Sequence, residues 1–270
     1  MTALQTPPGS DYERFVERSR HISAIDLRAY KPAQMERRLR SLMQRKNIRG
    51  FDLLAELLRR DFELRQEFEH FVTINVTQFY RDPERFKMLE RELQRMVSGR
   101  REPLQVWSAG CANGSEAFTI AMILATLAPG KEHRILATDI DLDSLAQARS
   151  GAGFSEAHLE TLPRAYRANF TVRDRETGEY AVVPKIRQMV RFERHDLIRD
   201  VYRQGFDLIA CRNVVIYFSD ATKRKIFSRF YDSLNPGGLL FIGATEIVSG
   251  AHDIGYEQLG YGLFRRPPVD

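Results

Sequence analysis

The chain has 270 residues, 43% of them hydrophobic and 29% charged, which is the composition of a globular protein with one large domain or two modest ones. We find no run of about 18 apolar residues and no basic-then-apolar segment among the first ten residues, so neither a membrane span nor a secretory signal is expected. Only Cys111 and Cys211 are present, which argues against a disulfide framework or a zinc site and favours a reducing, cytoplasmic location.

The net charge of +5 is concentrated in the N-terminal part of the chain. Residues 1–100 hold 20 Lys and Arg against 15 Asp and Glu, whereas residues 101–270 hold 21 of each. Between Arg28 and Arg49 there are eight basic residues and one acid, Glu36. This cluster indicates an acidic partner, which would be nucleic acid, an anionic membrane or an acidic protein helix. The alternative is a solvated helix face.

Residues 10–72 are predicted to form a helical module. Ser10 and Asp11 would cap the first helix, a second would cover residues 32–46 and end at Gly50, and a third would cover about 51–70. The core faces predicted by apolar spacing are Met35, Leu39, Leu42 and Met43 in the second helix, and Leu53, Leu54, Leu57 and Leu58 in the third. Arg38, Arg45 and Arg49 are predicted to lie beside the packed face of the second helix.

The segment 73–83 reads as a connecting loop. Polar Asn75, Thr77 and Arg81 alternate there with Phe79 and Tyr80, whose rings are expected to pack between modules. The dipeptide formed by residues 82 and 83, Asp-Pro, predicts the start of a helix over about 84–96.

From residue 104 onward, strands and helices alternate, which predicts a parallel sheet with helices on both faces. Strands are expected at residues 104–107, 134–139, 190–197, 206–213 and 234–243, with one or two more within 259–265. Residues 161–184 interrupt this alternation with a hairpin pattern, which predicts a small β insertion.

A glycine-bearing turn follows the first of these strands, between Gly110 and Gly114, and leads into a helix with apolar residues spaced for one buried face. Glycines let the backbone approach a ligand closely, and the helix start offers unpaired N–H groups, so a nucleotide-type pocket is one interpretation. The other interpretation is a turn in which the glycines only satisfy the backbone geometry and bind no ligand. Asp139 ends the second strand about 25 residues later, where it would accept from ribose hydroxyls or cap the next helix.

Four strings carry a resemblance to a known family: Asn-Val-Thr-Gln-Phe-Tyr-Arg-Asp at residues 75–82, Gly-Cys-x-x-Gly-x-Glu at 110–116, Ala-Thr-Asp-Ile-Asp at 137–141 and Cys-Arg-Asn-Val-Val-Ile-Tyr-Phe at 211–218. With the Asn-Pro-Gly-Gly turn at 235–238, the chain resembles the chemotaxis receptor methyltransferases, the CheR family, over nearly its whole length.

The resemblance implies a class I methyltransferase fold that binds S-adenosylmethionine, with a Rossmann-like, mainly parallel seven-stranded sheet. It also implies an N-terminal all-α domain and an antiparallel β insertion. The expected divisions are a receptor-docking domain at residues 1–72, a linker and helix at 73–103, and a catalytic domain at 104–270 with its β subdomain at about 161–189.

Such enzymes methylate glutamate side chains on the cytoplasmic helices of chemoreceptors, forming γ-glutamyl methyl esters. By resemblance, Asp139 would hold the ribose and Glu116 would meet the charged amino-acid part of the cofactor. Arg81 would grip either the substrate carboxylate or that of the cofactor, and Tyr217 would donate to the substrate or line the pocket. The remaining cofactor-binding positions are Asn75, Thr77, Gly110, Asp196, Leu197, Asn213 and Val214, and the receptor-docking positions are Arg38, Arg45 and Arg49.

Two departures from the family pattern stand out. The segment 112–118 reads Ala-Asn-Gly-Ser-Glu-Ala-Phe where members often have Ser-Thr-Gly-Glu-Glu-Pro-Tyr, and Asp196 stands where members often have Asn. No metal is expected, because no histidine has a suitable partner spacing, and a monomer needs no further assumption. The competing interpretations are a methyltransferase acting on nucleic acid, for which no base-stacking aromatic array is evident, and a non-catalytic cofactor-binding tether of receptors.

Overall fold

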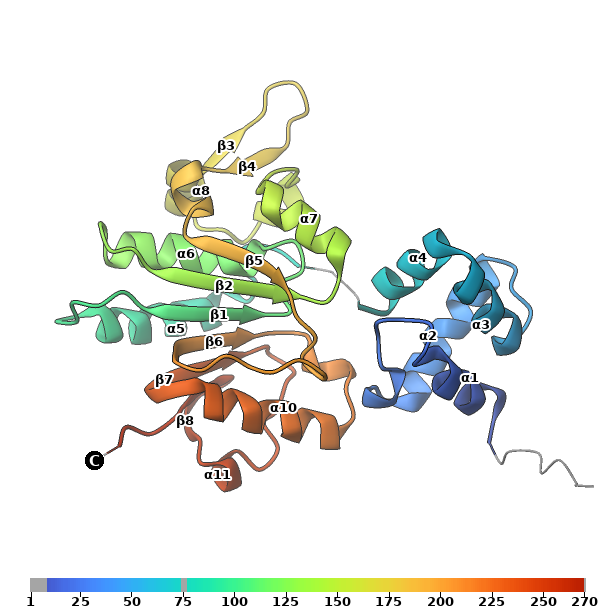
Figure 1. The fold of residues 1–270 in the computed structure, drawn as a ribbon. Helices are drawn as coiled ribbons and strands as arrows, with labels where there is room; N and C mark the ends of the chain where they lie inside the picture. The colour runs from blue at the N-terminus through green and yellow to red at the C-terminus, as the bar shows by residue number, and fades with distance from the viewer. Residues whose placement is uncertain (1–8, 74–76, 270) are drawn as a thin grey trace, which may run out of the picture. The chain divides into compact units, whose positions relative to one another are not determined.

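A computed structural model describes residues 9–73 and 77–269 of the chain (Figure 1). Its contacts divide the chain into two compact units. The helical unit comprises residues up to 74 together with Tyr217–Thr222, and the α/β unit comprises residues 75–216 and 223–270.

The helical unit contains α1 (Asp11–Ser19), α2 (Pro32–Arg45), α3 (Phe51–Arg60) and α4 (Phe62–Thr73), with a 3-10 turn at Leu27–Ala29. Ser10 caps α1 as predicted, because its Oγ accepts from the N–H of Glu13 at 3.2 Å while its own N–H donates to Glu13 Oε2 at 2.8 Å. The predicted apolar face of α2 is confirmed, since all four of its members are buried.

The single third helix predicted over 51–70 is wrong, because Asp61 breaks it into α3 and α4. Asp61 has extended backbone angles, and its carboxylate accepts from the N–H of Leu64 at 2.9 Å at the start of α4. Leu53 is 39% exposed, and the buried face of α3 is instead formed by Phe51, Leu54, Ala55 and Leu58. Gly50, at φ +91°, precedes α3 rather than ending α2, which already stops at Arg45.

The α/β unit is built on a seven-stranded sheet with the order β5-β2-β1-β6-β7-β9-β8. The first five strands of this order are parallel, and β9 runs antiparallel to both of its neighbours. This mainly parallel sheet confirms the predicted fold class. The strands are β1 (Gln105–Ala109), β2 (Arg134–Asp139), β5 (Val190–Arg194), β6 (Phe206–Cys211), β7 (Leu234–Ile242), β8 (Glu257–Gly260) and β9 (Leu263–Arg265).

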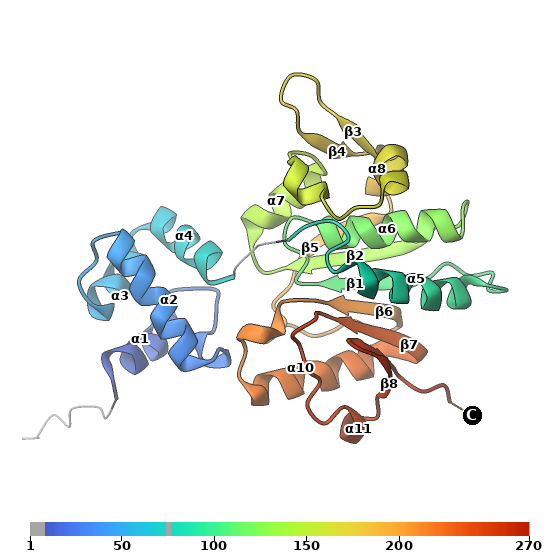
Figure 2. The same cartoon turned by 180° about the vertical axis from the view of Figure 1, so that it is seen from behind.

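Helices cover both faces of the sheet (Figures 1 and 2). One face carries α5 (Pro83–Val97), α6 (Ser115–Leu127) and α7 (Leu142–Ser150), whose apolar side chains join the main core cluster. The opposite face carries α10 (Asp220–Ser233), whose Phe230 ring lies 5.3 Å from that of Trp107 on β1. Residues 115–124 of α6 are buried all round, more than the single buried face predicted, because α5 and α9 (Pro184–Arg187) also pack on this helix.

Phe79 and Tyr80 belong to the core of the α/β unit, which corrects the expectation that they pack between modules. Tyr80 stacks on Phe86 of α5 with ring centroids 4.9 Å apart, and its N–H donates to Thr119 Oγ1 of α6 at 3.0 Å. The segment 77–82 is therefore packed against the α/β unit.

The predicted β insertion is confirmed. It consists of β3 (Thr171–Arg173) and β4 (Tyr180–Val182), which pair antiparallel and follow α8 (Arg164–Phe170) (Figure 1).

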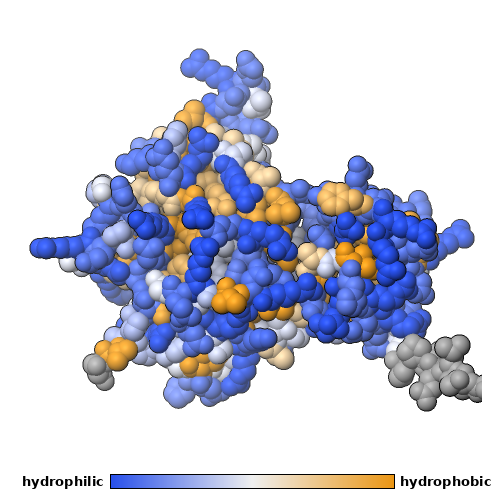
Figure 3. Space-filling model, in the orientation of Figure 1, coloured by the Kyte–Doolittle hydropathy of each residue, from blue (hydrophilic) through white to orange (hydrophobic). Residues whose placement is uncertain are grey.

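Hydrophilic residues predominate on the face of the molecule drawn in Figure 3. Across residues 9–73 and 77–269, we find no helix that is both long and apolar enough to cross a membrane.

Candidate functional site

Four parallel strands end together at one edge of the sheet, where the loops after them meet. The register pairs Ala109 of β1 with Thr138 of β2, and Cys211 of β6 with Ile242 of β7. Of the predicted site residues, Gly110, Asn213 and Val214 lie in these loops, and Asp139 is the last residue of β2. Ligands of open α/β sheets characteristically bind at this edge.

The turn after β1 is held in a conformation that requires glycine at Gly110. Its φ is +77°, and a Cβ built on it would lie 2.4 Å from Cγ2 of Val214 in the loop after β6. Gly110 and Val214, both predicted site residues, are therefore in close contact. The turn continues through Ala112 and Gly114, which also have positive φ.

Asp139, at the end of β2, ties this turn to the next loop. Its Oδ2 accepts from the N–H of Ala112 at 2.8 Å, and its Oδ1 accepts from the N–H of Asp141 at 3.0 Å. The residue is only 7% exposed, and burial raises the pKa of its carboxyl while these backbone N–H groups oppose the rise. After the bonds from Ala112, Ile140 and Asp141, the carboxylate keeps acceptor capacity for a ligand hydroxyl.

Glu116, in the first turn of α6, is buried beside Arg212. Its Oε1 accepts from Ser108 Oγ at 2.9 Å, and its Oε2 lies 3.7 Å from Nη1 of Arg212. Burial raises the pKa of Glu116, while the nearby Arg212 and Arg81 charges lower it. The arrangement places one carboxylate and two guanidinium groups in the same neighbourhood.

Arg212 itself holds the linker segment in place. Its Nη2 donates to the carbonyl oxygen of Arg81 at 2.8 Å and to Oδ2 of Asp82 at 2.7 Å. Its guanidinium lies over both the Phe86 and the Phe241 ring, at 4.9 and 4.8 Å from their centroids. Asp82 immediately precedes α5 and has left-handed backbone angles. Its side chain makes no hydrogen bond to the start of the helix and accepts from Arg212 instead.

Thr77 and Arg81, two further predicted residues, lie in this anchored segment and are half-buried. Asn75, predicted beside them, falls outside the described residues.

The backbone of Asn213 and Val214 is held by a carboxylate from another loop. Glu246, in the loop after β7, accepts four backbone N–H bonds: from Asn213 at 2.8 Å, Val214 at 3.0 Å, Val215 at 2.9 Å and Gly243 at 2.6 Å. Burial raises the pKa of Glu246, and these four donors oppose the rise. Asn213 adopts φ +61°, a conformation that this set of bonds stabilises.

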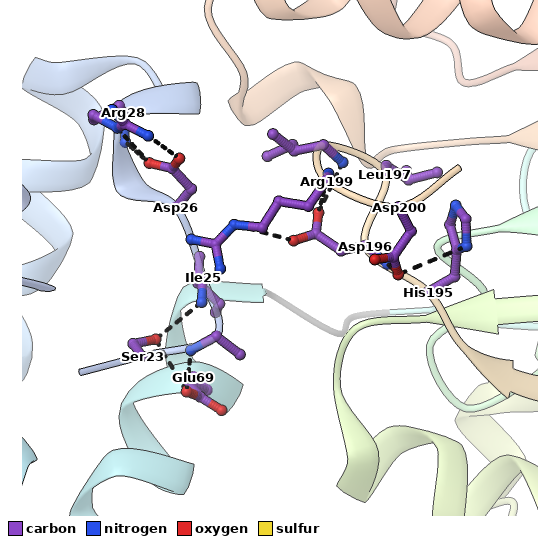
Figure 4. Close-up of polar contacts among 12 residues, drawn as sticks. Ser23, Ile25, Asp26, Arg28, Glu69, His195, Asp196, Leu197, Arg199 and Asp200 are labelled. Carbon is purple, nitrogen blue, oxygen red and sulfur yellow. Dashed lines mark hydrogen bonds and ion pairs between the residues drawn. The ribbon is translucent and has the colours of Figure 1, made fainter. Parts of the chain in front are cut away.

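Asp196 organises the turn after β5 (Figure 4). Its Oδ1 accepts from the N–H of Ile198 at 2.7 Å, and its Oδ2 lies 3.8 Å from Nε of Arg199. The carbonyl oxygen of Leu197 accepts from Tyr202 Oη at 2.7 Å and from Arg229 Nη1 at 2.9 Å. Both predicted residues are buried, and each has a structural partner of its own.

Four predicted residues belong to the helical unit: Tyr217, Arg38, Arg45 and Arg49. The carbonyl oxygen of Tyr217 accepts from the N–H of Lys31 at 2.9 Å. Arg38 is half-buried, and its Nη2 donates to the carbonyl oxygen of Phe71 at 2.6 Å, with the guanidinium 4.6 Å from the Phe71 ring centroid. Arg45 also lies over this ring, at 4.7 Å, but is exposed, as is Arg49.

Sequence reasoning missed two residues that shape the site, Arg212 and Glu246. Arg212 lies within the specific string at 211–218, so that string was the available signal. Glu246 lies 33 residues from Asn213, and its role depends on strand pairing that no local pattern reveals.

Comparison with known proteins identifies relatives of both units. A profile described as "CheR methyltransferase, all-alpha domain" matches residues 10–73, and one described as "CheR methyltransferase, SAM binding domain" matches residues 75–260. A chemotaxis protein methyltransferase of Listeria monocytogenes is 37% identical over 250 residues, which cover 92% of this chain and 94% of that protein. One of Vibrio parahaemolyticus is 32% identical over 251 residues, 90% of each.

Replacing Gly110 with Ala should abolish binding of S-adenosylhomocysteine in calorimetric titration, because the new Cβ would displace Val214. Gly99→Ala is the matched control, since Gly99 has φ +76° with nothing within 4 Å of the added Cβ. The control should cost only the left-handed strain, about 1–2 kcal/mol of stability, and retain binding. Equal affinity in both variants would contradict the role of close approach at Gly110.

Replacing Glu246 with Gln should lower the free energy of unfolding by at least about 2 kcal/mol, because an amide leaves buried N–H groups without an acceptor. It should also weaken S-adenosylhomocysteine binding by releasing Asn213 and Val214. Glu176→Gln, an exposed change in the loop of the β insertion, should alter neither quantity. Denaturant unfolding and calorimetry at neutral pH measure both, and unchanged affinity in Glu246→Gln would refute the positioning role.

Proposed function

This chain belongs to the CheR methyltransferase family, and we propose that it transfers a methyl group from S-adenosylmethionine to glutamate side chains on the cytoplasmic helices of chemotaxis receptors. The product would be a γ-glutamyl methyl ester. The observation that carries the proposal is the group of oppositely charged residues at the carboxyl edge of a sheet whose domain matches the CheR cofactor-binding domain.

The residues at this edge fit S-adenosylmethionine. A ribose needs a hydrogen-bond acceptor, and the buried Asp139 keeps acceptor capacity. The amino-acid end carries an ammonium and a carboxylate, and Glu116 with Arg81 and Arg212 offers both signs of charge. Gly110 lets Val214 pack against the turn after β1, and this contact would fix the shape of the site. Asn75, Thr77 and Asn213 are proposed to complete the cofactor site, with Asp196 and Leu197 beside the adenine.

S-adenosylmethionine supplies a methyl group made electrophilic by its sulfonium. The acceptor, a glutamate carboxylate, is already ionised near pH 7, so no general base is required. The work left to the protein is to align the carboxylate oxygen with the methyl carbon and to exclude water.

Arg81 is the proposed residue for gripping the incoming carboxylate, because a guanidinium binds a carboxylate in a fixed, bidentate orientation. Arg212 supports this role by holding the backbone of Arg81 at 2.8 Å. Pairing of Arg81 with the carboxylate of the cofactor is the competing role. Tyr217 is a second candidate for contact with the substrate carboxylate.

The helical domain is proposed to dock on the acidic receptor helix through its basic residues. Arg45 and Arg49 are exposed and thus available for this contact, whereas Arg38 is engaged with Phe71. We propose residues 1–72 as the docking domain, 73–103 as the linker that contributes to the cofactor site and 104–270 as the catalytic domain, acting in the cytoplasm. The match to chemotaxis methyltransferases favours this reading over a nucleic-acid substrate.

Incubation with methyl-labelled S-adenosylmethionine and a chemoreceptor cytoplasmic fragment should label the fragment with methyl groups that mild alkali releases as methanol. Arg81→Lys should lower kcat roughly tenfold or more, because a point charge replaces a bidentate fork. A fragment whose acceptor glutamates are changed to alanine is the control and should remain unlabelled. Alkali-stable label, or label on the control fragment, would refute glutamate esterification.

The double change Arg45→Glu and Arg49→Glu should raise KM for the receptor fragment and leave affinity for S-adenosylhomocysteine unchanged, because like charges would then meet at the docking surface. Arg59→Glu with Arg60→Glu is the matched control, with the same charge change at two exposed positions of α3, outside the basic cluster between Arg28 and Arg49. An equal rise in KM in both double variants would reduce the effect to overall charge and refute specific docking.

A further inference from the structure

A cavity of about 690 Å³ lies at the opposite edge of the sheet from the cofactor site. It is lined by the first residues of the strands, including Gln105 of β1, Arg134 of β2 and Phe206 of β6. Asp139 is the last residue of β2, and Asn213 follows the end of β6, so both lie at the opposite edge. Because these strands are parallel, a ligand in this cavity would not compete with the cofactor.

Five basic side chains from different elements surround the cavity, against one acidic lining residue, Glu132. They are Lys131, Arg134, Lys185, Arg191 and Arg203. Glu193 pairs with two of them, at 2.7 Å from Arg191 Nε and 2.6 Å from Arg203 Nη2. Lys131 Nζ donates to the carbonyl oxygen of Arg100.

Arg134 and Lys185 differ from the other three basic residues because the described part of the chain gives their side chains neither an ion pair nor a hydrogen bond. Both residues are exposed. Cations gathered at one cavity without matching acids raise the local concentration of anions.

His133, which also lines the cavity, adds a buried donor. Its Nδ1 accepts from the N–H of Leu104 at 2.9 Å, so the ring proton is on Nε2. That Nε2 is buried and has no hydrogen-bond partner among the described residues, and the side chain is 2% exposed. Burial also lowers the pKa of His133. Buried donors in native proteins nearly always have an acceptor.

We propose that this cavity is a second ligand site, which binds a small phosphate-bearing anion of nucleotide size. The volume falls within the range of small-molecule sites, about 300–1,000 Å³. Guanidinium and ammonium groups converging from several elements suit the multiple negative charges of a phosphorylated compound better than a single carboxylate.

Calorimetric titration with pyrophosphate, in a phosphate-free buffer of low ionic strength, tests the site. The full chain is first saturated with S-adenosylhomocysteine, so that binding in the cofactor site does not contribute. Wild type should bind, and Arg134→Gln with Lys185→Gln should weaken binding roughly tenfold or more, since each change removes a charge-assisted contact. Methyltransferase activity should be retained in this double variant.

Arg175→Gln with Lys225→Gln is the matched control, because it removes the same charge from two exposed positions of the α/β unit outside the cavity. The control should bind pyrophosphate as wild type does. No binding by wild type, or equal weakening in the two double variants, would overturn the proposal. Citrate binding as tight as pyrophosphate binding would overturn the preference for phosphate.

Discussion

Buried carboxylates that accept backbone N–H bonds hold the functional edge of this protein together. Asp139 joins the turn after β1 to the loop after β2, and Glu246 joins the loop after β6 to the loop after β7. Each carboxylate is removed from water at a cost, which shows in its raised pKa, and each recovers part of that cost through backbone donors. Four loops from separate parts of the sequence thereby become one surface, on which Gly110 meets Val214.

The buried charge of Arg212 at this edge is stabilised by aromatic rings and by nearby carboxylates. Arg212 is 7% exposed, and its guanidinium contacts Asp82, the backbone of Arg81 and two aromatic rings, whereas its Nε has no hydrogen-bond partner among the described residues. Its other neighbour, Glu116, extends the network to the first helix after the glycine turn. Charges are weakly screened in this buried region. Small displacements of these groups therefore change the local electrostatic potential strongly. Arg81 and Asp82 are thus held at this edge of the sheet by electrostatics, and the neighbouring Tyr80 by packing.

Local patterns predicted most of the fold. The alternation of strands and helices, the cap at Ser10, the stripe of α2 and the hairpin insertion all follow from short-range preferences. The break at Asp61 was missed because no glycine or proline marks it, and only the structure shows that Leu53 is exposed. Within the site, the sequence located the residues at strand ends, and family resemblance supplied their expected roles. The role of Glu246 could not be predicted from the sequence, because its four backbone donors come from two loops that meet only after the sheet has formed.

The most direct test of this account asks whether the buried carboxylate of Asp139 holds the ribose of the cofactor. Calorimetry would compare S-adenosylhomocysteine with its 2′,3′-dideoxy analogue, on wild type and on Asp139→Asn, with unfolding curves to verify that both are folded. The account predicts that wild type prefers the natural ligand by roughly tenfold or more and that Asp139→Asn loses most of this preference. An undiminished preference in the variant would contradict the assignment, and a wild-type protein that binds neither ligand would contradict the cofactor site itself.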